Sequence, residues 1–252
     1  VLVYPDYLEG DASKRRSGGS YSEGLASISA VVKQGGHKVS LIHINHEFDE
    51  KEYKENLKKY KNADLIGFST RTTAFDYVKD LLKWTKEEMP NVFTFMGGYH
   101  PILVPDECIE VDYLDAVCVG EGEYPILELM DRMRDGKDYY DIQSFYFKKG
   151  KKIIKNPVRP LIENLDDLPF PDINLFDYKN LDTTKVNTAL IMLSRGCIYA
   201  CTYCGNSQFR NIYPNKVKYA RFRSPEKSIE LIKNVLKQYP NIKYIFFRDA
   251  IF

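Results

Sequence analysis

Apolar residues follow two alternating patterns in the first half of the chain. Short continuous runs predict five strands, at residues 1–4, 38–44, 64–69, 92–96 and 115–119. Between the runs, apolar residues recur every three or four positions, as at Leu25, Ile28 and Val32, and predict helices. Strands that alternate with helices predict an α/β fold with a five-stranded parallel sheet, covered on both faces.

Small and hydroxyl-bearing residues follow three of these strands. Because the carboxyl ends of parallel strands share one edge of the sheet, the residues after them are candidates for ligand binding. The candidates are Ser69, Thr70, Thr73, Gly97, Gly98, Gly120, Glu121 and Gly122. Ordinary turn chemistry explains any one of these loops, but three on one edge favour a ligand site. Neither GxGxxG nor GxxxxGK[ST] occurs, which disfavours a nucleotide domain of those two types.

Composition changes at residues 141–186. A hairpin is expected to turn at Lys149-Gly150, and a proline-containing connector with scattered apolar anchors follows it. We interpret this region as an ordered strap between a first domain, 1–140, and a second segment, 187–252. In the second segment a strand is expected at 189–194, a helix after Ser224, and another strand at 243–247.

Three cysteines, Cys197, Cys201 and Cys204, have the spacing C-x3-C-x2-C after the first of those strands. Soft thiolate ligands favour zinc or an iron–sulfur cluster. Structural zinc normally takes four protein ligands, and the fourth would have to come from Cys108, Cys118 or a histidine. A cubic iron–sulfur cluster with one open iron needs three ligands, and the odd count favours it. Three unconnected buried cysteines are the remaining alternative.

The first half resembles the cobalamin-binding domain, a flavodoxin-like (Rossmann-like) module. The resemblance rests on "GLASISAVVKQGGHKV", "ADLIGFSTRTT", "FMGGYHP" and "DAVCVGEGEYPILEL". It implies that the loops after strands three to five, with the eight candidates above, embrace the nucleotide tail of cobalamin. The DxHxxG motif of cobalamin mutases is absent, so a lower axial histidine on cobalt is not expected.

The stretch "RGCIYACTYCGN" resembles the signature of radical S-adenosylmethionine enzymes. The resemblance implies that Cys197, Cys201 and Cys204 bind a [4Fe–4S] cluster, whose fourth iron binds S-adenosylmethionine, and that Tyr203 lies beside the adenine. It also implies that the second segment begins a (β/α) barrel. Asp249 is similar to an acidic residue often found at the exit of the second barrel strand, although a turn carboxylate is an equal alternative.

Together the two halves resemble the cobalamin-dependent radical S-adenosylmethionine superfamily. The implied activity is cleavage of S-adenosylmethionine to a 5′-deoxyadenosyl radical and methyl transfer from cobalamin to an unactivated centre. A cobalamin-dependent cyclase or rearrangement enzyme is the nearest alternative, and a non-catalytic cobalamin or iron–sulfur sensing module is another. A small-molecule substrate and a reductant such as flavodoxin or ferredoxin are the expected partners.

Composition narrows the possible partners and the cellular compartment. A net charge of +1 over 252 residues gives no reason to expect a nucleic-acid partner. No apolar run approaches the roughly 20 residues of a membrane-spanning helix, so no membrane partner is expected. Five cysteines without a disulfide-like pattern, and no evident signal peptide, indicate the cytoplasm. The chain begins and ends within apparent strands, so a longer polypeptide is expected.

Overall fold

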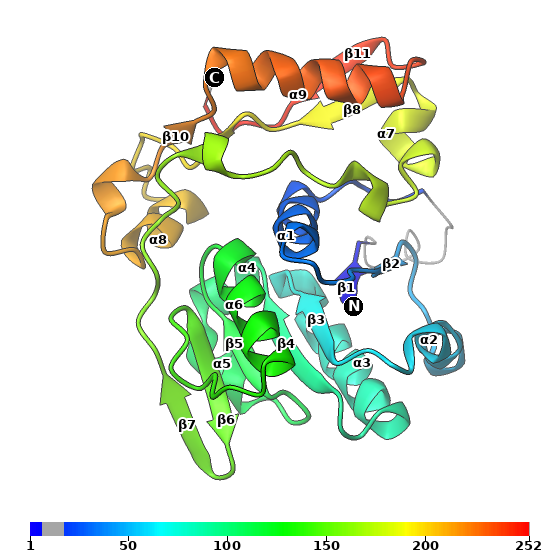
Figure 1. The fold of residues 1–252 in the computed structure, drawn as a ribbon, viewed down its shortest axis with the longest axis vertical. Coiled ribbons are helices and arrows are strands. Elements are labelled where there is room, and N and C mark those ends of the chain that lie inside the picture. The colour runs from blue at the N-terminus through cyan, green and yellow to red at the C-terminus, as the bar shows by residue number, and fades with distance from the viewer. Residues whose placement is uncertain (7–17, 252) are drawn as a thin grey trace.

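The predicted parallel sheet forms in the computed structural model, which describes residues 1–6 and 18–251 (Figure 1). Five strands pair in parallel in the order β2-β1-β3-β4-β5, as in a flavodoxin-like fold. They are β1 (Leu2–Pro5), β2 (Leu41–Ile44), β3 (Leu65–Ser69), β4 (Phe93–Gly97) and β5 (Ala116–Cys118). The expected fold class is confirmed. Most of the loop after β1, residues 7–17, lies outside the described residues.

Helices cover both faces of this sheet because alternate strand residues point to opposite sides. Ala116 and Cys118 belong to the core under α1 (Glu23–Gln34) and α6 (Glu123–Arg134), whereas Val117 belongs to the opposite core. That second core is covered by α2 (Glu50–Leu57), α3 (Phe75–Glu88) and α5 (Pro105–Glu110). The apolar pattern does not predict α2, whose mostly charged sequence buries only Tyr53 and Leu57.

The predicted hairpin forms from β6 (Phe145–Lys149) and β7 (Lys152–Lys155). Its first strand pairs antiparallel with β5, with Phe147 opposite Ala116, so the hairpin extends the sheet to seven strands. The strap then crosses α1 through three 3₁₀ turns and α7 (Asp182–Lys185). Ile173 and Phe176 of the strap join the core beneath α1, which agrees with an ordered connector.

The second segment contains one strand–helix–strand unit. β8 (Thr188–Ile191) and β11 (Tyr244–Phe247) pair in parallel, and α9 (Pro225–Gln238) connects them, as expected for the start of a (β/α) barrel. Ser224 caps α9 by accepting a hydrogen bond from the Lys227 amide. The predicted strand 189–194 is divided, because Ser194–Arg195 form a separate strand, β9, antiparallel to β10 (Arg221–Phe222).

Two short helices complete the described chain near the ligand edge, α4 (Tyr99–Leu103) and α8 (Gly205–Asn211). Among the helices of the described residues, none has the length and apolar character needed to cross a membrane.

Candidate functional site

A cavity of about 490 Å³ lies between the carboxyl edge of the sheet and the second segment. Seven of the eight residues predicted at the sheet edge line it: Ser69, Thr70, Gly97, Gly98, Gly120, Glu121 and Gly122. Thr73 does not, because it is exposed in the 3₁₀ turn Thr72–Ala74, beyond the cavity rim. The opposite wall includes Gly196 and Asn206, which lie on either side of the three cysteines.

The sheet-edge loops are fixed by backbone hydrogen bonds to one another. The Thr70 amide donates to the Gly97 carbonyl at 2.7 Å, and the His100 amide donates to the Thr70 carbonyl at 3.1 Å. Gly98 has a φ of 102°, and a Cβ there would lie 2.9 Å from the Thr70 carbonyl oxygen. Glycine is therefore required at 98 by the neighbouring loop. By contrast, a Cβ at Gly97 would meet nothing closer than 3.8 Å, so that position is open toward a ligand.

Histidine does not contribute to the cavity wall within the described residues. His100, at the sheet edge, is buried against the Phe75 ring, with ring centroids 4.2 Å apart, and its Nδ1 contacts the Thr72 hydroxyl. Burial lowers the pKa of His100. Its neighbour Tyr99 lines the cavity instead and stacks on Phe209 of α8 at 5.4 Å.

Two charged cavity residues were not identified from the sequence, Glu23 and Arg221, whereas Arg71 and Arg248 follow strands whose ends were expected at a ligand edge. Glu23 begins α1, and burial raises the pKa of its carboxyl from 4.5 to about 7, although Arg195 and Arg223 oppose the change. Arg248 follows β11, and its Nη1 donates to the Tyr21 carbonyl at 3.2 Å. Glu23 lies at a helix start and Arg221 in a strand of two residues, where no residue spacing marks a cavity position.

The three cysteines lie on the loop between β9 and α8. The Cys204 amide donates to the Cys201 carbonyl at 3.1 Å, and the Ser207 hydroxyl donates to the Cys204 carbonyl at 2.7 Å. At the start of the loop, Gly196 has a φ of 80°, and a Cβ there would lie 2.1 Å from the Tyr219 carbonyl oxygen. Only glycine fits this turn before Cys197.

All five cysteines are free thiols, and they fall into two groups. Cys108 and Cys118 are buried in the two cores of the sheet, where burial raises the pKa of each thiol to about 12. Cys201 is exposed, and Cys197 and Cys204 are half-buried. Within the described part of the chain, no three His, Cys, Asp or Glu side chains are gathered closely enough to hold a metal ion. The three loop thiols are thus near in sequence but not brought together, and their role as ligands stays a prediction.

Tyr203 and Asp249 differ in their surroundings, because the first is exposed to solvent and the second is hydrogen-bonded to the chain. Tyr203 is 92% exposed and does not line the cavity. Asp249 accepts hydrogen bonds at one oxygen from the Leu193 amide, at 2.9 Å, and from the Ser194 hydroxyl. It therefore ties the exit of β11 to the start of the cysteine loop. Its other oxygen, Oδ2, is buried and has no hydrogen-bond partner among the described residues.

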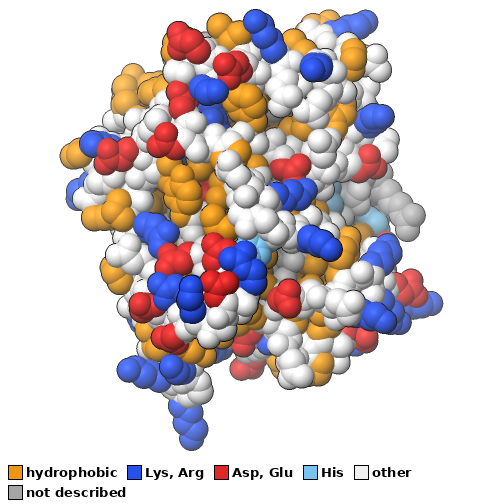
Figure 2. Space-filling model, viewed as in Figure 1, with side chains coloured by type: hydrophobic (Ala, Val, Ile, Leu, Met, Phe, Trp, Pro, Cys, Tyr) orange, Lys and Arg blue, Asp and Glu red, His pale blue; other side chains and the backbone are white. Residues whose placement is uncertain are grey.

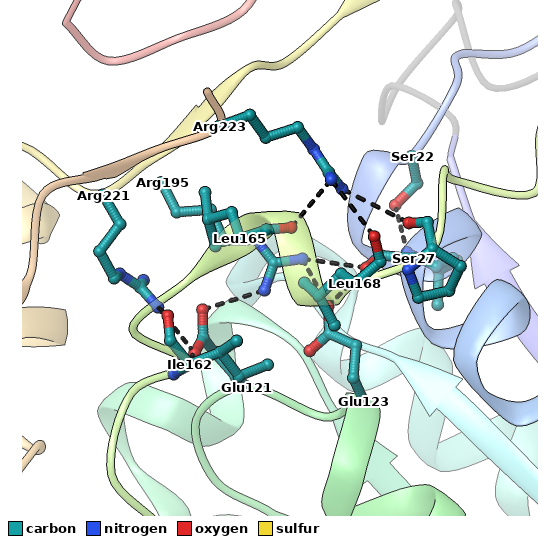
Figure 3. A network of polar contacts seen from close by, with 12 residues as sticks. Ser22, Ser27, Glu121, Glu123, Ile162, Leu165, Leu168, Arg195, Arg221 and Arg223 are labelled. Atoms are coloured by element: carbon teal, nitrogen blue, oxygen red, sulfur yellow. Dashed lines mark hydrogen bonds and ion pairs between the residues drawn. The ribbon is translucent and has the colours of Figure 1, made fainter. Parts of the chain in front are cut away.

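The side chain of Arg195, directly before Gly196, extends to Glu121 and Glu123 at the sheet edge (Figure 3). Its guanidinium donates to Glu121 at 3.0 Å and to Glu123 at 2.5 Å. Glu121 also accepts a hydrogen bond from Arg221 at 3.0 Å. Burial raises the pKa of Glu121, but the two arginines outweigh it, so the pKa is lowered and the carboxylate is charged. The Glu121 side chain, which was predicted to contact cobalamin, is thus already paired with two arginines.

Known proteins resemble the chain over its whole length. Residues 18–130 match the family model of the B12 binding domain. An uncharacterized methyltransferase of Pyrococcus horikoshii is 31% identical over 91% of this chain and 48% of that protein. The anaerobic magnesium-protoporphyrin IX monomethyl ester cyclase of Rubrivivax gelatinosus is 25% identical over 95% of this chain and 43% of that protein.

A solved structure extends the likeness to the whole described fold. It is the cobalamin-dependent S-adenosylmethionine radical enzyme OxsB with aqua-cobalamin and S-adenosylmethionine bound, with a TM-score of 0.75 and 20% identity. The match covers 100% of this chain and 34% of that one. This chain spans less than half the length of each of these three proteins.

The fold is that of a B12-binding domain followed by a strand–helix–strand unit. Both sequence resemblances agree with these comparisons: residues 18–130 match the B12 binding domain, and the whole chain has the fold of a cobalamin-dependent radical S-adenosylmethionine enzyme.

Proposed function

We propose that this chain is part of an enzyme that uses a [4Fe–4S] cluster, S-adenosylmethionine and cobalamin to transfer a methyl group to an unactivated centre of a small molecule. The observation that carries this proposal is one cavity with two unlike walls. One wall is the ligand edge of the B12-binding domain, and the other contains Gly196 and Asn206, which flank the cysteines. Cofactors bound at the two walls would face each other.

Cobalamin is assigned to the sheet edge. The open backbone at Gly97 and the loops at Ser69-Thr70 and Gly120–Gly122 fit a large polar ligand that approaches the main chain closely. Glu121 contributes through its backbone, since its carboxylate is held by arginines. Thr73 is left out of this set. Because no histidine of the described chain lines the cavity, we expect the lower face of cobalt to lack a histidine ligand.

The cluster is assigned to Cys197, Cys201 and Cys204. Three free thiols within eight positions supply a soft donor set that is one ligand short of a zinc site, and the buried Cys108 and Cys118 do not complete it. We assign Tyr203, beside Cys204, to the adenine of S-adenosylmethionine. Bound together, the cofactors supply radical and methyl-transfer chemistry, whereas the protein orients them and excludes water.

The proposed electron donor and cellular compartment follow from this chemistry. A flavodoxin- or ferredoxin-type reductant is the expected electron donor, because the cluster must be reduced before each turnover. Free, partly exposed thiols suit a reducing compartment, so we assign the protein to the cytoplasm.

Ring closure is the second candidate. The similarity to an anaerobic cyclase covers 95% of this chain, which favours it among the alternatives. The same three cofactor sites would serve either reaction, so the substrate pocket decides between them.

Anaerobic reconstitution of the full-length protein tests the proposal. About four irons and four sulfides per chain, with bound cobalamin followed by its visible spectrum, are the expected result. Changing Cys201 to Ala should abolish stable iron binding and leave cobalamin bound, since Cys201 is exposed and lies outside the B12-binding domain.

Cys108→Ala is the matched control, because it removes a thiol in a buried core and should retain both iron and cobalamin. One zinc and no iron would contradict the radical assignment. Normal iron without retained cobalamin would remove methyl transfer from cobalamin while leaving radical chemistry in place.

A further inference from the structure

A buried network of charged side chains joins the cysteine loop to the sheet edge (Figure 3). Arg195 lies two positions before Cys197 and carries its guanidinium into the B12-binding domain. Its Nη1 donates to Glu121 Oε1 at 3.0 Å, and its Nη2 donates to Glu123 Oε1 at 2.5 Å. One side chain therefore connects the loop assigned to the cluster with the loop assigned to cobalamin.

Arg221 supports this connection from the neighbouring strand. It lies directly opposite Arg195 in the β9–β10 pair. Its Nη1 donates to Glu121 Oε2 at 3.0 Å and to the Ile162 carbonyl at 2.7 Å. Arg195 and Arg221, on paired strands, thus each bind one oxygen of the Glu121 carboxylate. Arg221 also binds the strap, through the Ile162 carbonyl.

Helix α1 supplies a third contact to the sheet domain. The Ser27 hydroxyl donates to Glu123 Oε1 at 2.7 Å and accepts a hydrogen bond from Arg195 Nη2 at 3.0 Å. Arg195 is therefore held by α1, by the loop after β5 and by the first residue of α6. These contacts fix both its direction and its distance from the sheet edge.

Burial makes the network sensitive to small changes. Glu123 and Arg221 are only 2% and 6% exposed. Burial alone would lower the pKa of Arg195, but Glu123 and Glu121 more than offset it, so the pKa is raised and the guanidinium stays charged. Two glutamates balance two arginines. Removing one member would leave a buried charge without its partner.

We propose that Arg195 is a positioning residue that fixes the cysteine loop against the loop after β5, through Glu121 and Glu123. The inference rests on the proposed function, because those two loops are the ones assigned to the two cofactors. The planar guanidinium of Arg195 donates to two carboxylates in different directions and so fixes the orientation of the loop. A single ammonium group cannot do this. Arg195 would thereby set the spacing between the cluster and the cobalt.

Hydrogen exchange of the full-length protein without cofactors is the first test, using Arg195→Lys, which keeps the charge and loses the fork. We expect exchange to accelerate about tenfold in both 118–124 and 194–206, because the two loops lose their shared anchor. Arg132→Lys is the matched control. Arg132 also contacts two carboxylates, Glu128 and Asp141, but within the sheet domain and away from the cavity, so neither loop should respond.

Glu121→Gln is the second variant, for the case in which lysine at 195 prevents folding. It removes the charge that both arginines share and keeps the shape of the side chain. The same two segments should exchange faster. Acceleration confined to 194–206, or equal to that of Arg132→Lys, would overturn the proposal, since Arg195 would then only stabilise its own loop.

A second readout measures position in the reconstituted protein. Arg195→Lys should retain the iron content of the unchanged protein, because all three cysteines remain, while the magnetic coupling between cob(II)alamin and the reduced cluster changes. Unchanged coupling would assign Arg195 a stabilising role only. If the unchanged protein binds neither iron nor cobalamin, the proposed function fails, and the exchange experiment still decides whether Arg195 joins the two loops.

Discussion

The sheet edge and the cysteine loop bound the same cavity but are built in different ways. The edge follows strands buried on both faces, and its loops are joined by hydrogen bonds such as that from the Thr70 amide to Gly97. The cysteine loop follows a strand of two residues and exposes Ile198, Tyr199 and Tyr203. The first wall is held by its own backbone hydrogen bonds, whereas the thiols of the second are near in sequence and are not gathered into one ligand set in the described chain.

This difference has a thermodynamic meaning. A preformed wall binds its ligand with little ordering cost, whereas a loop that closes around a metal cluster couples binding to local folding. Changes at the sheet edge should therefore alter the stability of the protein without cofactors. Changes in the cysteine loop should have little effect until a ligand is added.

Replacing a core residue beneath the sheet edge should give the largest contrast. Phe68 of β3 is 1% exposed, so Phe68→Ala should lower the free energy of unfolding by about 3–5 kcal/mol. Tyr203→Ala should change it by less than about 0.5 kcal/mol in the protein without cofactors, because that ring is in solvent. Urea unfolding measures both. A large loss at Tyr203 would mean that the cysteine loop is already packed.

Two adjacent glycines of the sheet edge should differ strongly. Gly98→Ala should cost about 2–3 kcal/mol, because φ is positive and the new Cβ would press on the Thr70 backbone. Gly97→Ala should cost less than about 1 kcal/mol, since its Cβ would make only ordinary contact with Cys118, at 3.8 Å. Thermal unfolding compares the pair. Equal losses would show that the edge is not fixed by the contact between these loops.

The half-buried Glu23 should make the cavity wall sensitive to pH. Since burial raises its pKa from 4.5 to about 7, the native protein holds this proton more tightly than the unfolded chain does. Stability from this group is complete below pH 4.5 and falls as the pH rises toward 7, by about 1–2 kcal/mol for a carboxyl that cavity water partly screens.

Glu23→Gln should remove that part of the pH dependence. Unfolding free energies between pH 4.5 and 7 measure it. Glu230→Gln, on the exposed face of α9, is the control and should leave the slope unchanged. If the unfolding free energy of Glu23→Gln still fell as the pH rises, the pH dependence would belong to another group.

Local patterns predicted most of the fold. The five parallel strands, the helix that Gly35 ends and the cap at Ser224 each depend on neighbours within a few residues. The helix α2 was missed because two buried residues among charged ones give too weak a period. The strand 189–194 was predicted whole because periodicity does not record where a strand changes its partner.

The site was predictable only where sequence neighbours form it. Residues after β3, β4 and β5 reach the cavity together because parallel strands end at one edge. The pairing of Arg195 with Glu121 joins residues 74 positions apart, and neither spacing nor composition marks it. Thr73 was included because it follows a strand, but the chain turns away from the edge before reaching it.

The hairpin that extends the sheet also affects how copies of the chain meet. β7 is the outer strand of the described sheet, and such an edge can recruit strands from other molecules into aggregates. Lys152 and Lys155 lie on β7, and Lys149 and Lys151 lie beside them at the end of β6 and in the turn. Figure 2 shows Lys and Arg side chains gathered at the end of the molecule where Figure 1 places the hairpin tip. The charges on this hairpin therefore disfavour the pairing of β7 with strands of other molecules.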